Sequence, residues 1–432
     1  MPASPATDRQ TAEFPFRIGF DEACAIVDAV AAERRLAAIP LSLSRAHGHV
    51  QARDVVAGLP QPPFDNSAMD GFALRHADLA ADGPTRLQLV GDQFAGLTGD
   101  FRLEPGQCLR ITTGAQMPEG ADTVVMKENT RIEASRIEAT RIDGSRADGD
   151  WVEVLVAPRP GQHVRRAGED SRVGDLLLRA GDVLTPSRIA LAASQGIAQL
   201  DVARRPTVAV FATGDELVEP GMPLRPGQIY NSNREQLMGL LRAEGLEPVA
   251  FPTLPDDPAQ ITSALRHAGE AFDLVLTCGG VSAGEKDHLP ALLQARGRVR
   301  FWKVRMKPGM PLLLAEGGTL GPALFLCLPG NPVSVLATWL AIGRRLVDGL
   351  QGRAPRPLRR ARLTDAWHKR HERLEFLRGR WQIDAAGVSQ VTPNPADGSH
   401  RMHAAADSDA LIVLGEGACD YDAGAVVELL PY

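Results

Sequence analysis

Residues 274–288 (LVLTCGGVSAGEKDH) combine a short apolar run, a glycine-rich polar loop and the start of a helical pattern. Strand, loop and helix in this order are typical of a parallel α/β domain. Glycines let backbone N–H groups approach an anion closely, and the N-terminus of the following helix adds a favourable dipole. Within this loop Ser282 could donate to a phosphate and Asp287 could hold a metal ion. The alternative is a Gly-Gly turn without a ligand, because such pairs punctuate many loops.

The chain has 432 residues, more than one hydrophobic core usually organises, so we expect roughly two to four domains. It is 44% hydrophobic and 23% charged, a composition typical of soluble globular proteins. It lacks an apolar stretch long enough to span a membrane and the features of a signal peptide. A net charge of −6 argues against non-specific nucleic-acid binding. The cysteines lack metal-ligand spacing and favour reduced thiols in the cytoplasm: Cys24, Cys108, Cys278, Cys327 and Cys419.

A second distinctive stretch, residues 62–74 (PPFDNSAMDGFAL), precedes a region of short strands. Its prolines and its Asp-Asn-Ser run favour a polar turn, although its many hydrogen-bonding groups beside an exposed Phe and Met are unusual for a connector. Residues 87–158 alternate apolar runs with glycine and proline turns, which predicts a β-rich domain. A period-five repeat at 131–149 fits neither a helix nor a strand. We interpret it as a surface hairpin extension or a slipped duplication, without a catalytic role.

Beyond residue 206 the pattern changes to strands that alternate with helices. Strands are expected at 207–212, 248–253, 273–278, 299–304, 311–315 and 323–328. Helices are expected at 234–243, after Asp257 as N-cap, and at 333–347. This alternation predicts a doubly wound α/β domain, in which ligands bind outside the carboxyl ends of the strands. Polar segments follow the predicted strands at residues 213–216, 256–257, 279–287 and 328–332.

Every second residue is a cation where the chain approaches a Pro-Gly turn, namely Lys303, Arg305 and Lys307. A strand with a period of two would place them on one face, either as a solvated sheet edge or as part of a site. Carboxylates follow the neighbouring predicted strands, namely Asp215, Glu216, Asp256 and Asp287. Together these residues suggest a site where carboxylates hold Mg²⁺ while the lysines neutralise phosphate or another oxyanion.

Residues 356–432 contain strand-like runs separated by glycine-containing turns, which predicts a small β-barrel. Arg378, Ser399 and His400 are the candidate contributions of this region to a site. For His400 and the other histidines of this region, a solvated surface position is the favoured interpretation: His368, His371 and His403.

Five motifs occur in order along the chain: PPFDNSAMDG at 62–71, TGDEL at 213–217, GGVS at 279–282, KPG at 307–309 and LPGNP at 328–332. In these motifs the chain resembles the molybdopterin molybdenumtransferase (MoeA) family, which includes the C-terminal domain of gephyrin. The resemblance runs from about residue 18 to the C-terminus. The first motif is highly specific, whereas GGVS is shared with related pterin- and nucleotide-handling domains.

Together with the strand and helix pattern, the resemblance implies a multidomain α/β plus β fold. Its centre is a doubly wound parallel α/β domain, accompanied by an N-terminal β-rich domain, a linking or dimerisation segment and a C-terminal small β-barrel. The implied boundaries are 18–50 with 161–205 for the linking/dimerisation domain, 51–160 for the β-rich domain, 206–355 for the molybdopterin-binding α/β domain, and 356–432 for the barrel.

The resemblance further implies an enzyme of molybdenum cofactor biosynthesis that inserts molybdate into adenylylated molybdopterin with Mg²⁺ and releases AMP. The implied protein is a cytoplasmic homodimer without nucleic-acid or membrane partners. A separate molybdopterin adenylyltransferase would supply the adenylylated substrate. Metal and lysines would polarise the phosphoanhydride, and no covalent nucleophile is required.

By motif position, the resemblance implies metal and nucleotide contacts at Glu216, Asp256 and Asp287. It implies phosphate or molybdate contacts at Lys303 and Lys307, and it adds Asp65 to the catalytic residues. The implied substrate-binding residues are Thr113, Asp170, Gly279, Gly280, Ser282, Pro329, Gly330, Asn331, Arg378 and Ser399.

The resemblance does not fully define the implied site at two positions. The motif does not separate Asp256 from the adjacent Asp257 as the metal ligand. Met310 stands where a common bacterial pattern has lysine, which would remove one cation from the rim of the site.

Two other classes of function are compatible with parts of this pattern. A gephyrin-like binding scaffold would need the fold and the dimer but not the metal, and the retained carboxylates and lysines favour the enzyme. A stand-alone adenylyltransferase of the related small domain would leave the N-terminal half of the chain unexplained.

Overall fold

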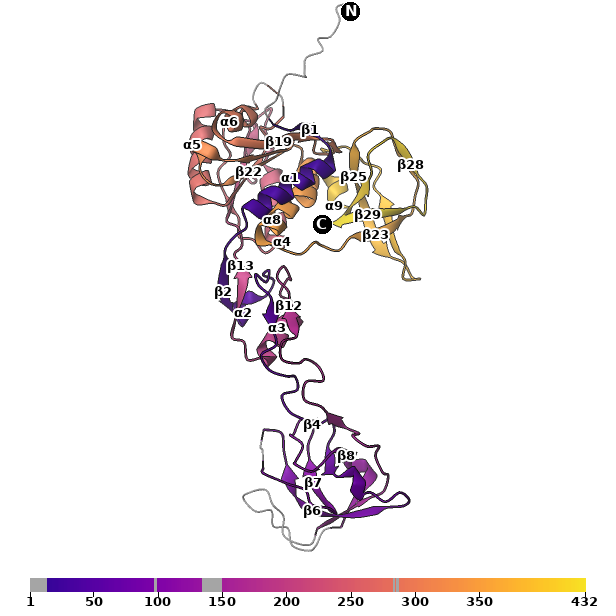
Figure 1. Cartoon of the computed structure of the whole chain (residues 1–432). Helices are drawn as coiled ribbons and strands as arrows, with labels where there is room; N and C mark the ends of the chain where they lie inside the picture. The colour runs from indigo at the N-terminus through magenta and orange to yellow at the C-terminus, as the bar shows by residue number, and fades with distance from the viewer. Residues whose placement is uncertain (1–13, 97–98, 134–149, 283, 285–286) are drawn as a thin grey trace, which may run out of the picture. The chain divides into compact units, whose positions relative to one another are not determined.

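The computed structural model describes residues 14–96, 99–133, 150–282, 284 and 287–432, which form two compact units (Figure 1). One unit comprises the chain up to Arg53 together with Ala180–Ile189 and Ala198–Tyr432. The other comprises Asp54–Arg179 and Ala190–Ile197. The first unit contains the α/β domain and the barrel, and the second contains the β-rich domain.

A seven-stranded sheet forms the centre of the α/β domain, with the order β1-β19-β21-β22-β18-β14-β17. Neighbouring strands are parallel except at β21, which is antiparallel to both of its neighbours. The predicted doubly wound α/β domain is therefore confirmed, with one antiparallel strand. The bounds are β1 (Phe16–Ile18), β19 (Arg298–Val304), β21 (Leu313–Glu316), β22 (Leu324–Leu328), β18 (Leu274–Cys278), β14 (Val208–Ala212) and β17 (Val249–Ala250).

Helices cover both faces of this sheet because its strands are apolar on both faces. Leu274 and Leu276 of β18 pack into one hydrophobic cluster, whereas Val275 packs into the other. The helices α5 and α6 cover one face, and α1, α4, α7 and α8 cover the other (Figure 1). The bounds are α1 (Phe20–Glu33), α4 (Ser232–Ala243), α5 (Pro258–Ala271), α6 (His288–Arg296), α7 (Pro332–Thr338) and α8 (Arg344–Gln351), with a π-helical segment at Trp339–Gly343.

The C-terminal strands form a barrel in the order β25-β26-β23-β29-β27, closed by pairing between β25 and β27. This confirms the predicted barrel, whose interior is filled by buried residues such as Leu377, Val391 and Ile412. The short strand β20 (Met306–Lys307) pairs with β25, so the chain enters the barrel sheet soon after leaving β19. The bounds are β23 (Arg359–Leu363), β24 (Trp367–Lys369), β25 (Leu374–Ile383), β26 (Ser389–Pro393), α9 (Met402–Ala406), β27 (Ala410–Leu414), β28 (Cys419–Tyr421) and β29 (Val426–Pro431).

The second unit is built on a six-stranded sheet in the order β8-β5-β7-β6-β10-β9, which confirms the β-rich domain. Phe72, Leu87 and Val152 belong to its buried cluster. Antiparallel β9 and β10 flank residues 134–149, so most of the period-five repeat lies outside the described residues. The bounds are β5 (Gly71–Leu74), β6 (Thr85–Gln93), β7 (Gln107–Ile111), β8 (Thr123–Met126), β9 (Thr130–Glu133) and β10 (Trp151–Val154).

Short strand pairs and helices complete the two units. Within the described ranges, none of the helices is both long and apolar enough to cross a membrane. The remaining bounds are β2 (Ala38–Ser42), α2 (Leu43–Ala46), β3 (Val55–Val56), β4 (Asn66–Ser67), β11 (Val164–Arg165), β12 (Leu176–Leu178), α3 (Pro186–Ser194), β13 (Gln199–Ala203), β15 (Leu217–Val218) and β16 (Ile229–Tyr230).

Asp273 joins the beginnings of β14 and β18. Its carboxylate accepts two hydrogen bonds from the Arg204 guanidinium, at 2.7 and 2.8 Å, and two from the N–H and hydroxyl of Thr207, at 2.7 and 2.8 Å. Burial alone would raise the pKa of Asp273, but the bonds from Arg204 and Thr207 outweigh burial and hold the pKa below its ordinary value. The carboxylate is therefore more stable as an anion in the folded chain than in the unfolded chain.

We expect Asp273→Asn to lower the free energy of unfolding by about 1–3 kcal/mol at neutral pH, because Arg204 loses its charged partner. A lowered carboxylate pKa stabilises the fold above the ordinary pKa of about 4, and this stabilisation is lost as the pH falls. The difference from wild type in urea unfolding should therefore shrink towards about pH 3. Asp201→Asn, which removes an exposed ion pair with Arg53, is the control and should cost less than about 0.5 kcal/mol. Equal effects of the two substitutions would contradict this role of Asp273.

Candidate active site

Three loops meet at the carboxyl edge of the sheet because β14, β18 and β22 are adjacent and parallel. Their backbones remain hydrogen-bonded beyond the strand ends. The N–H of Thr213 donates to the carbonyl of Cys278, and the N–H of Gly279 donates to the carbonyl of Leu328, both at 3.1 Å. The polar segments predicted to follow these strands therefore lie side by side, where ligands bind in doubly wound folds.

These loops surround a cavity of about 740 Å³, the central cavity. Two polar atoms of its wall, Oγ1 of Thr213 and Oδ1 of Asn233, are buried and have no hydrogen-bond partner among the described residues. Such atoms are rare in folded proteins, and in a cavity wall they are available to a ligand. The structure brings many of the predicted site residues together in this wall: Glu216, Asp256, Gly279, Gly280, Ser282, Asp287, Pro329, Gly330 and Asn331.

Gly279 and Gly280 bring the loop after β18 close to the loop after β14. Their φ angles, +93° and +67°, lie in the left-handed region that favours glycine. A Cβ atom on Gly279 would lie 2.9 Å from the carbonyl oxygen of Thr213, and one on Gly280 would lie 2.8 Å from its Oγ1. Because there is no room for side chains here, the backbone itself forms this part of the cavity wall, as in phosphate-binding loops.

The predicted metal ligands Glu216, Asp256 and Asp287 enter the central cavity from three different loops. Oδ2 of Asp287 accepts the N–H of Gly284 at 2.8 Å, just before α6. In the part of the chain that the structure describes, no three His, Cys, Asp or Glu side chains are grouped closely enough to hold a metal ion. Mg²⁺ is commonly held by one or two carboxylates together with water and substrate phosphates, so the donor chemistry of this wall fits Mg²⁺.

The adjacent residues Asp256 and Asp257 have different surroundings. Oδ1 of Asp257 accepts the N–H groups of Ala259 and Gln260 at 2.8 and 2.9 Å and caps α5 as predicted. The hydrogen bond from the Gln260 N–H is the main cause that holds the pKa of Asp257 below its ordinary value. Asp256 instead lines the central cavity. Of the two carboxylates, Asp256 is therefore the one placed to meet a ligand.

A smaller cavity of about 330 Å³ shares Pro311, Pro329 and Asn331 with the wall of the central cavity. We name it the lysine cavity after Lys307, which lines it. The remaining lining residues come from the turn after β20, from α7 and from the barrel: Pro308, Gly309, Met310, Ser334, Arg373, Asp397, Gly398 and Ser399.

Lys307 is the charged centre of the lysine cavity. Its Nζ lies 3.0 Å from a carboxylate oxygen of Glu375 and 3.0 Å from one of Asp397. Burial would lower the pKa of Lys307, but the hydrogen bonds to Asp397 and Glu375 outweigh burial and raise the pKa. The group is therefore an ammonium ion throughout the physiological pH range.

The expectation that Lys303, Arg305 and Lys307 share one face is wrong. Lys303 has a φ of +65°, which breaks the alternation near the end of β19. Its Nζ lies 4.9 Å from the ring centroids of both Phe16 and Trp302, outside the two cavity walls. Lys307 already belongs to the barrel sheet, so a period of two does not extend across the change of sheet. The site role of Lys303 remains a prediction.

Ser399 and Arg378 both come from the barrel but occupy different positions. Ser399 lines the lysine cavity, and its Oγ accepts a hydrogen bond from the Asn331 amide at 3.0 Å. Arg378 is 2% exposed and donates to the carbonyl of Ala396. Arg378 therefore supports the loop that carries Asp397 and Ser399 and lies outside the walls of the two cavities.

The predicted site residues of the second unit lie on segments that hydrogen bonds join within that unit. Asp65 accepts the N–H of Ala167 at 2.8 Å, and this bond is the main cause of its lowered pKa. The N–H and hydroxyl of Thr113 donate to Asp70 at 2.8 and 2.9 Å. Asp170 is exposed and follows the segment of Ala167. Their roles in a shared site remain predictions.

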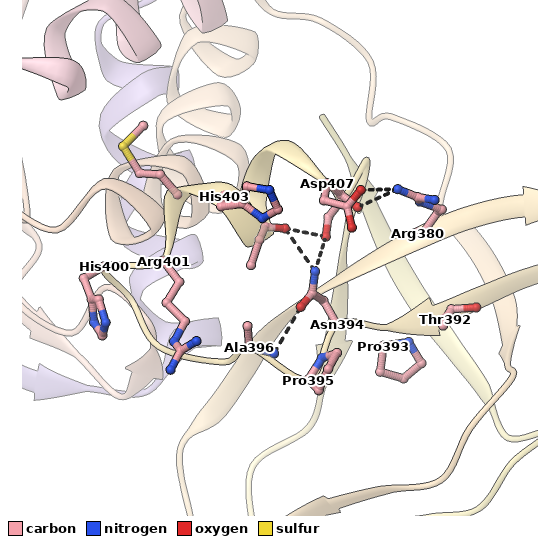
Figure 2. A pocket seen from close by; sticks show the side chains of 13 residues that line it. Arg380, Thr392, Pro393, Asn394, Pro395, Ala396, His400, Arg401, His403 and Asp407 are labelled. Atoms are coloured by element: carbon pink, nitrogen blue, oxygen red, sulfur yellow. Dashed lines mark hydrogen bonds and ion pairs between the residues drawn. The ribbon is translucent and has the colours of Figure 1, made fainter.

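A third cavity of about 800 Å³ lies beside α9 and the loop that precedes it (Figure 2). Arg380 and Asp407 form an ion pair on one side, and Oδ1 of Asn394 accepts the N–H of Ala396 at 3.0 Å on another. His400 is exposed, as predicted, but lines both this cavity and the central cavity.

The histidines of the barrel differ in their surroundings. His403 is exposed and His368 forms an exposed ion pair with Asp420, which confirms the prediction for both. The prediction of a solvated surface position is wrong for His371. Its side chain is 22% exposed, and its Nε2 lies 3.3 Å from the buried carboxylate of Glu375.

Several residues that contribute to these cavities were not among those predicted from the sequence. The Asn233 amide donates to the carbonyl of Gly330 at 2.6 Å, and Asn231 caps α4 by accepting the Arg234 N–H at 3.2 Å. The run of Asn, Ser and Asn before a predicted helix was the available signal for both. Glu375 and Asp397 carried no comparable signal, because their role depends on contact with Lys307.

Comparisons with known proteins agree over nearly the whole chain. Family models match at residues 18–196 (MoeA N-terminal region, domain I and II), 209–348 (probable molybdopterin binding domain) and 360–432 (MoeA C-terminal region, domain IV). The molybdopterin molybdenumtransferase of Haemophilus influenzae is 38% identical over 395 residues, covering 91% of this chain and 93% of the relative. Molybdopterin molybdenumtransferase 2 of Mycobacterium tuberculosis is 37% identical over 415 residues, covering 93% and 97%. Among solved structures, a molybdopterin biosynthesis moeA protein from Pyrococcus horikoshii OT3 is 26% identical with a TM-score of 0.77, covering 96% and 100%.

The α/β domain with its glycine loop, the closed barrel and the three successive family matches define a protein with the MoeA domain architecture. With relatives above 30% identity over most of both chains, this chain belongs to the molybdopterin molybdenumtransferase family. It is an enzyme of molybdenum cofactor biosynthesis, and the resemblance stated from its motifs is confirmed.

The different surroundings of Asp256 and Asp257 predict different effects of substitution. Asp256→Asn should reduce formation of the molybdenum cofactor by roughly 10- to 100-fold, as expected for a carboxylate that contacts a ligand in the central cavity, without changing the melting temperature. Asp257→Ala should lower the melting temperature because α5 loses its N-cap, while cofactor formation is retained. Thermal unfolding and cofactor formation measured on both variants check this. Loss of cofactor formation in Asp257→Ala but not in Asp256→Asn would show that the site role belongs to Asp257.

Proposed function

We propose that this enzyme inserts molybdate into adenylylated molybdopterin in the presence of Mg²⁺ and releases AMP. The observation that carries the proposal is that a cavity with carboxylates and a glycine loop shares a wall with a cavity that contains a charged lysine. A reaction between a nucleotide phosphate and a second oxyanion needs two such environments next to each other. The names of the relatives support the same class of reaction.

In this proposal the phosphates of adenylylated molybdopterin lie against the loop after β18. The backbone at Gly279 and Gly280 allows close approach, and the hydroxyl of Ser282 can donate to a phosphate oxygen. Pro329 and Gly330 belong to the loop after β22 and complete the wall beside Gly279. Backbone rather than side chains would therefore determine how closely the nucleotide can approach.

Mg²⁺ would be held by one or two of the carboxylates Glu216, Asp256 and Asp287, with water and phosphate oxygens as its other ligands. When bound, it supplies the positive charge that lets phosphates lie beside these carboxylates and stabilises charge on the phosphoanhydride. The carboxylates themselves orient the ion by entering the cavity from separate loops.

Molybdate would lie in the lysine cavity. The ammonium group of Lys307 offsets the charge of the anion, and the Ser399 hydroxyl and the Asn331 amide can donate to its oxygens. Met310 lines this cavity at the position where lysine is common in the family's bacterial pattern. In this chain Lys307 and Arg373 would thus provide the positive charge that molybdate meets in this cavity.

The reaction would break the phosphoanhydride bond when an oxygen of molybdate or of water attacks the phosphorus of the AMP group, and the bridging oxygen stays with the phosphate of molybdopterin. If the oxygen comes from molybdate, its bond to molybdenum breaks, AMP leaves with that oxygen, and the dithiolene sulfurs take its place on molybdenum. If water attacks, the displaced molybdate oxygen leaves as water with the two thiol protons of the dithiolene. The protein's own contribution is to hold two anions close together in fixed orientation, so no covalent nucleophile is required.

We also propose a cytoplasmic homodimer in which Asp65, Thr113 and Asp170 of one subunit complete the cavities of the other. The support is the family resemblance of these positions. The five cysteines are free thiols in the structure, in line with a reducing compartment. A twofold interface would create two identical composite sites.

The reaction can be tested by measuring AMP release from adenylylated molybdopterin with and without molybdate. We expect release to depend on both molybdate and Mg²⁺, whereas a gephyrin-like scaffold would release no AMP. Purified chain with molybdopterin and ATP should form no adenylylated molybdopterin, because a separate adenylyltransferase supplies that substrate. AMP release that is the same with and without molybdate would contradict the proposal, and so would adenylylation of molybdopterin by this chain alone.

The composite site can be tested with two inactive variants, Asp65→Ala and Lys307→Ala. If subunits exchange at random, half of the dimers are mixed and one of their two sites is intact, so the mixture should regain roughly a quarter of wild-type activity. Each variant refolded alone is the control and should stay inactive. Verified mixed dimers without activity would mean that each site is built within one subunit.

A further inference from the structure

Lys307 contacts two carboxylates that differ in burial. Its Nζ lies 3.0 Å from an oxygen of Glu375, whose side chain is 3% exposed, and 3.0 Å from an oxygen of Asp397, whose side chain is 50% exposed. One ammonium group therefore faces two negative charges. Arg373 also lines the lysine cavity, so its two cations are matched by two carboxylates, and the cavity has no net positive charge while both contacts persist. The carboxylates thus offset the attraction that the cations would exert on an oxyanion.

Glu375 is a fixed partner of Lys307. The register between β20 and β25 places the two residues opposite each other on neighbouring parallel strands. The carboxylate also lies 3.3 Å from Nε2 of His371, and it accepts a hydrogen bond from the Trp367 indole N–H at 3.4 Å. A buried carboxylate with several partners is costly to separate from them, so Glu375 holds the lysine in place.

Asp397 is a movable partner of Lys307. Its loop is anchored one residue earlier, where the carbonyl of Ala396 accepts a bond from Arg378 and the N–H of Ala396 donates to Asn394 at 3.0 Å. These anchors do not involve the Asp397 carboxylate, which is half exposed and can rotate into water. The hydrogen bond from Lys307 is the main cause that holds the pKa of Asp397 below its ordinary value.

We propose that Asp397 is an internal competitor for the oxyanion site: its carboxylate occupies Lys307 in the empty enzyme and is displaced when a tetrahedral oxyanion binds. This inference rests on the proposed binding of molybdate in the lysine cavity. A carboxylate oxygen and a molybdate oxygen present the same acceptor to the ammonium group. Asp397 thereby lowers the apparent affinity for the oxyanion by the fraction of time that it occupies the lysine.

The test is calorimetric titration of the full-length chain with molybdate and, separately, with sulfate as a second tetrahedral dianion. Asp397→Asn should bind molybdate about two- to fivefold more tightly, the factor expected from the stability of a half-exposed ion pair. Glu375→Gln should bind molybdate more weakly, because Lys307 loses the partner that positions it. Both substitutions remove one negative charge beside the same lysine, so general electrostatics alone would shift the affinity in the same direction in both.

Asp407→Asn is the matched control. It removes a carboxylate of similar exposure, 56%, from an ion pair with Arg380 in the same domain, and it should leave molybdate affinity unchanged. Thermal unfolding of each variant shows whether it is folded. The comparison of Asp397→Asn with Asp407→Asn can overturn the proposal even if Glu375→Gln does not fold. Equal affinities of these two Asp→Asn variants, or no detectable binding in either, would overturn it.

Turnover separates this inference from the proposed function. If AMP release depends on molybdate but Asp397→Asn leaves both the affinity and the KM for molybdate unchanged, the competitor role is wrong and the enzyme function stands. If Asp397→Asn binds molybdate more tightly but neither the wild-type chain nor any variant releases AMP, the competitor role stands and the proposed reaction is wrong.

Discussion

The close approach of two backbones at the end of β14 and β18 constrains the rest of the central cavity. The carbonyl and the hydroxyl of Thr213 occupy the space that side chains at residues 279 and 280 would need. Both positions also require left-handed φ angles, so only glycine satisfies the conformation and the contact together. Because these loops are in contact, the carboxylates after β14, β17 and β18 face one cavity instead of three separate stretches of surface.

A second constraint is the path of the chain between two sheets. β19 ends in the α/β domain at Val304, and β20 begins in the barrel sheet at Met306. This abrupt change places Lys307 opposite Glu375 of the barrel while its cavity still shares Asn331 with the α/β domain. The lysine cavity is thus built from both parts of the first unit, and its charge depends on the barrel as much as on the sheet.

Much of this organisation could be predicted because it rests on local patterns. The strands of the α/β domain are short apolar runs between turns, and the rule that ligands bind at their carboxyl ends located Glu216, Asp256 and Asp287 without knowledge of their contacts. The antiparallel direction of β21 depends on its connection to its neighbours and leaves no mark in its composition. The three-residue strand β1 is too short to show a period.

The residues that the sequence analysis misplaced are those whose surroundings come from distant parts of the chain. Alternating Lys303, Arg305 and Lys307 would share a face only in an uninterrupted strand, and neither the left-handed φ of Lys303 nor the change of sheet is visible in the alternation. His371 looks like a surface histidine until the fold brings it next to buried Glu375. Such long-range contacts decide burial and charge, which local sequence cannot report.

The two cavities differ in the charges that an anionic substrate meets. The central cavity has an excess of carboxylates, so on the proposed reaction a phosphate would enter together with a cation that offsets them. In the lysine cavity Lys307 is already paired with two carboxylates, so on the proposed competition an oxyanion would contact the ammonium group fully only after Asp397 leaves. An anion that arrived without its cation, or that could not displace the half-exposed carboxylate, would then be bound weakly.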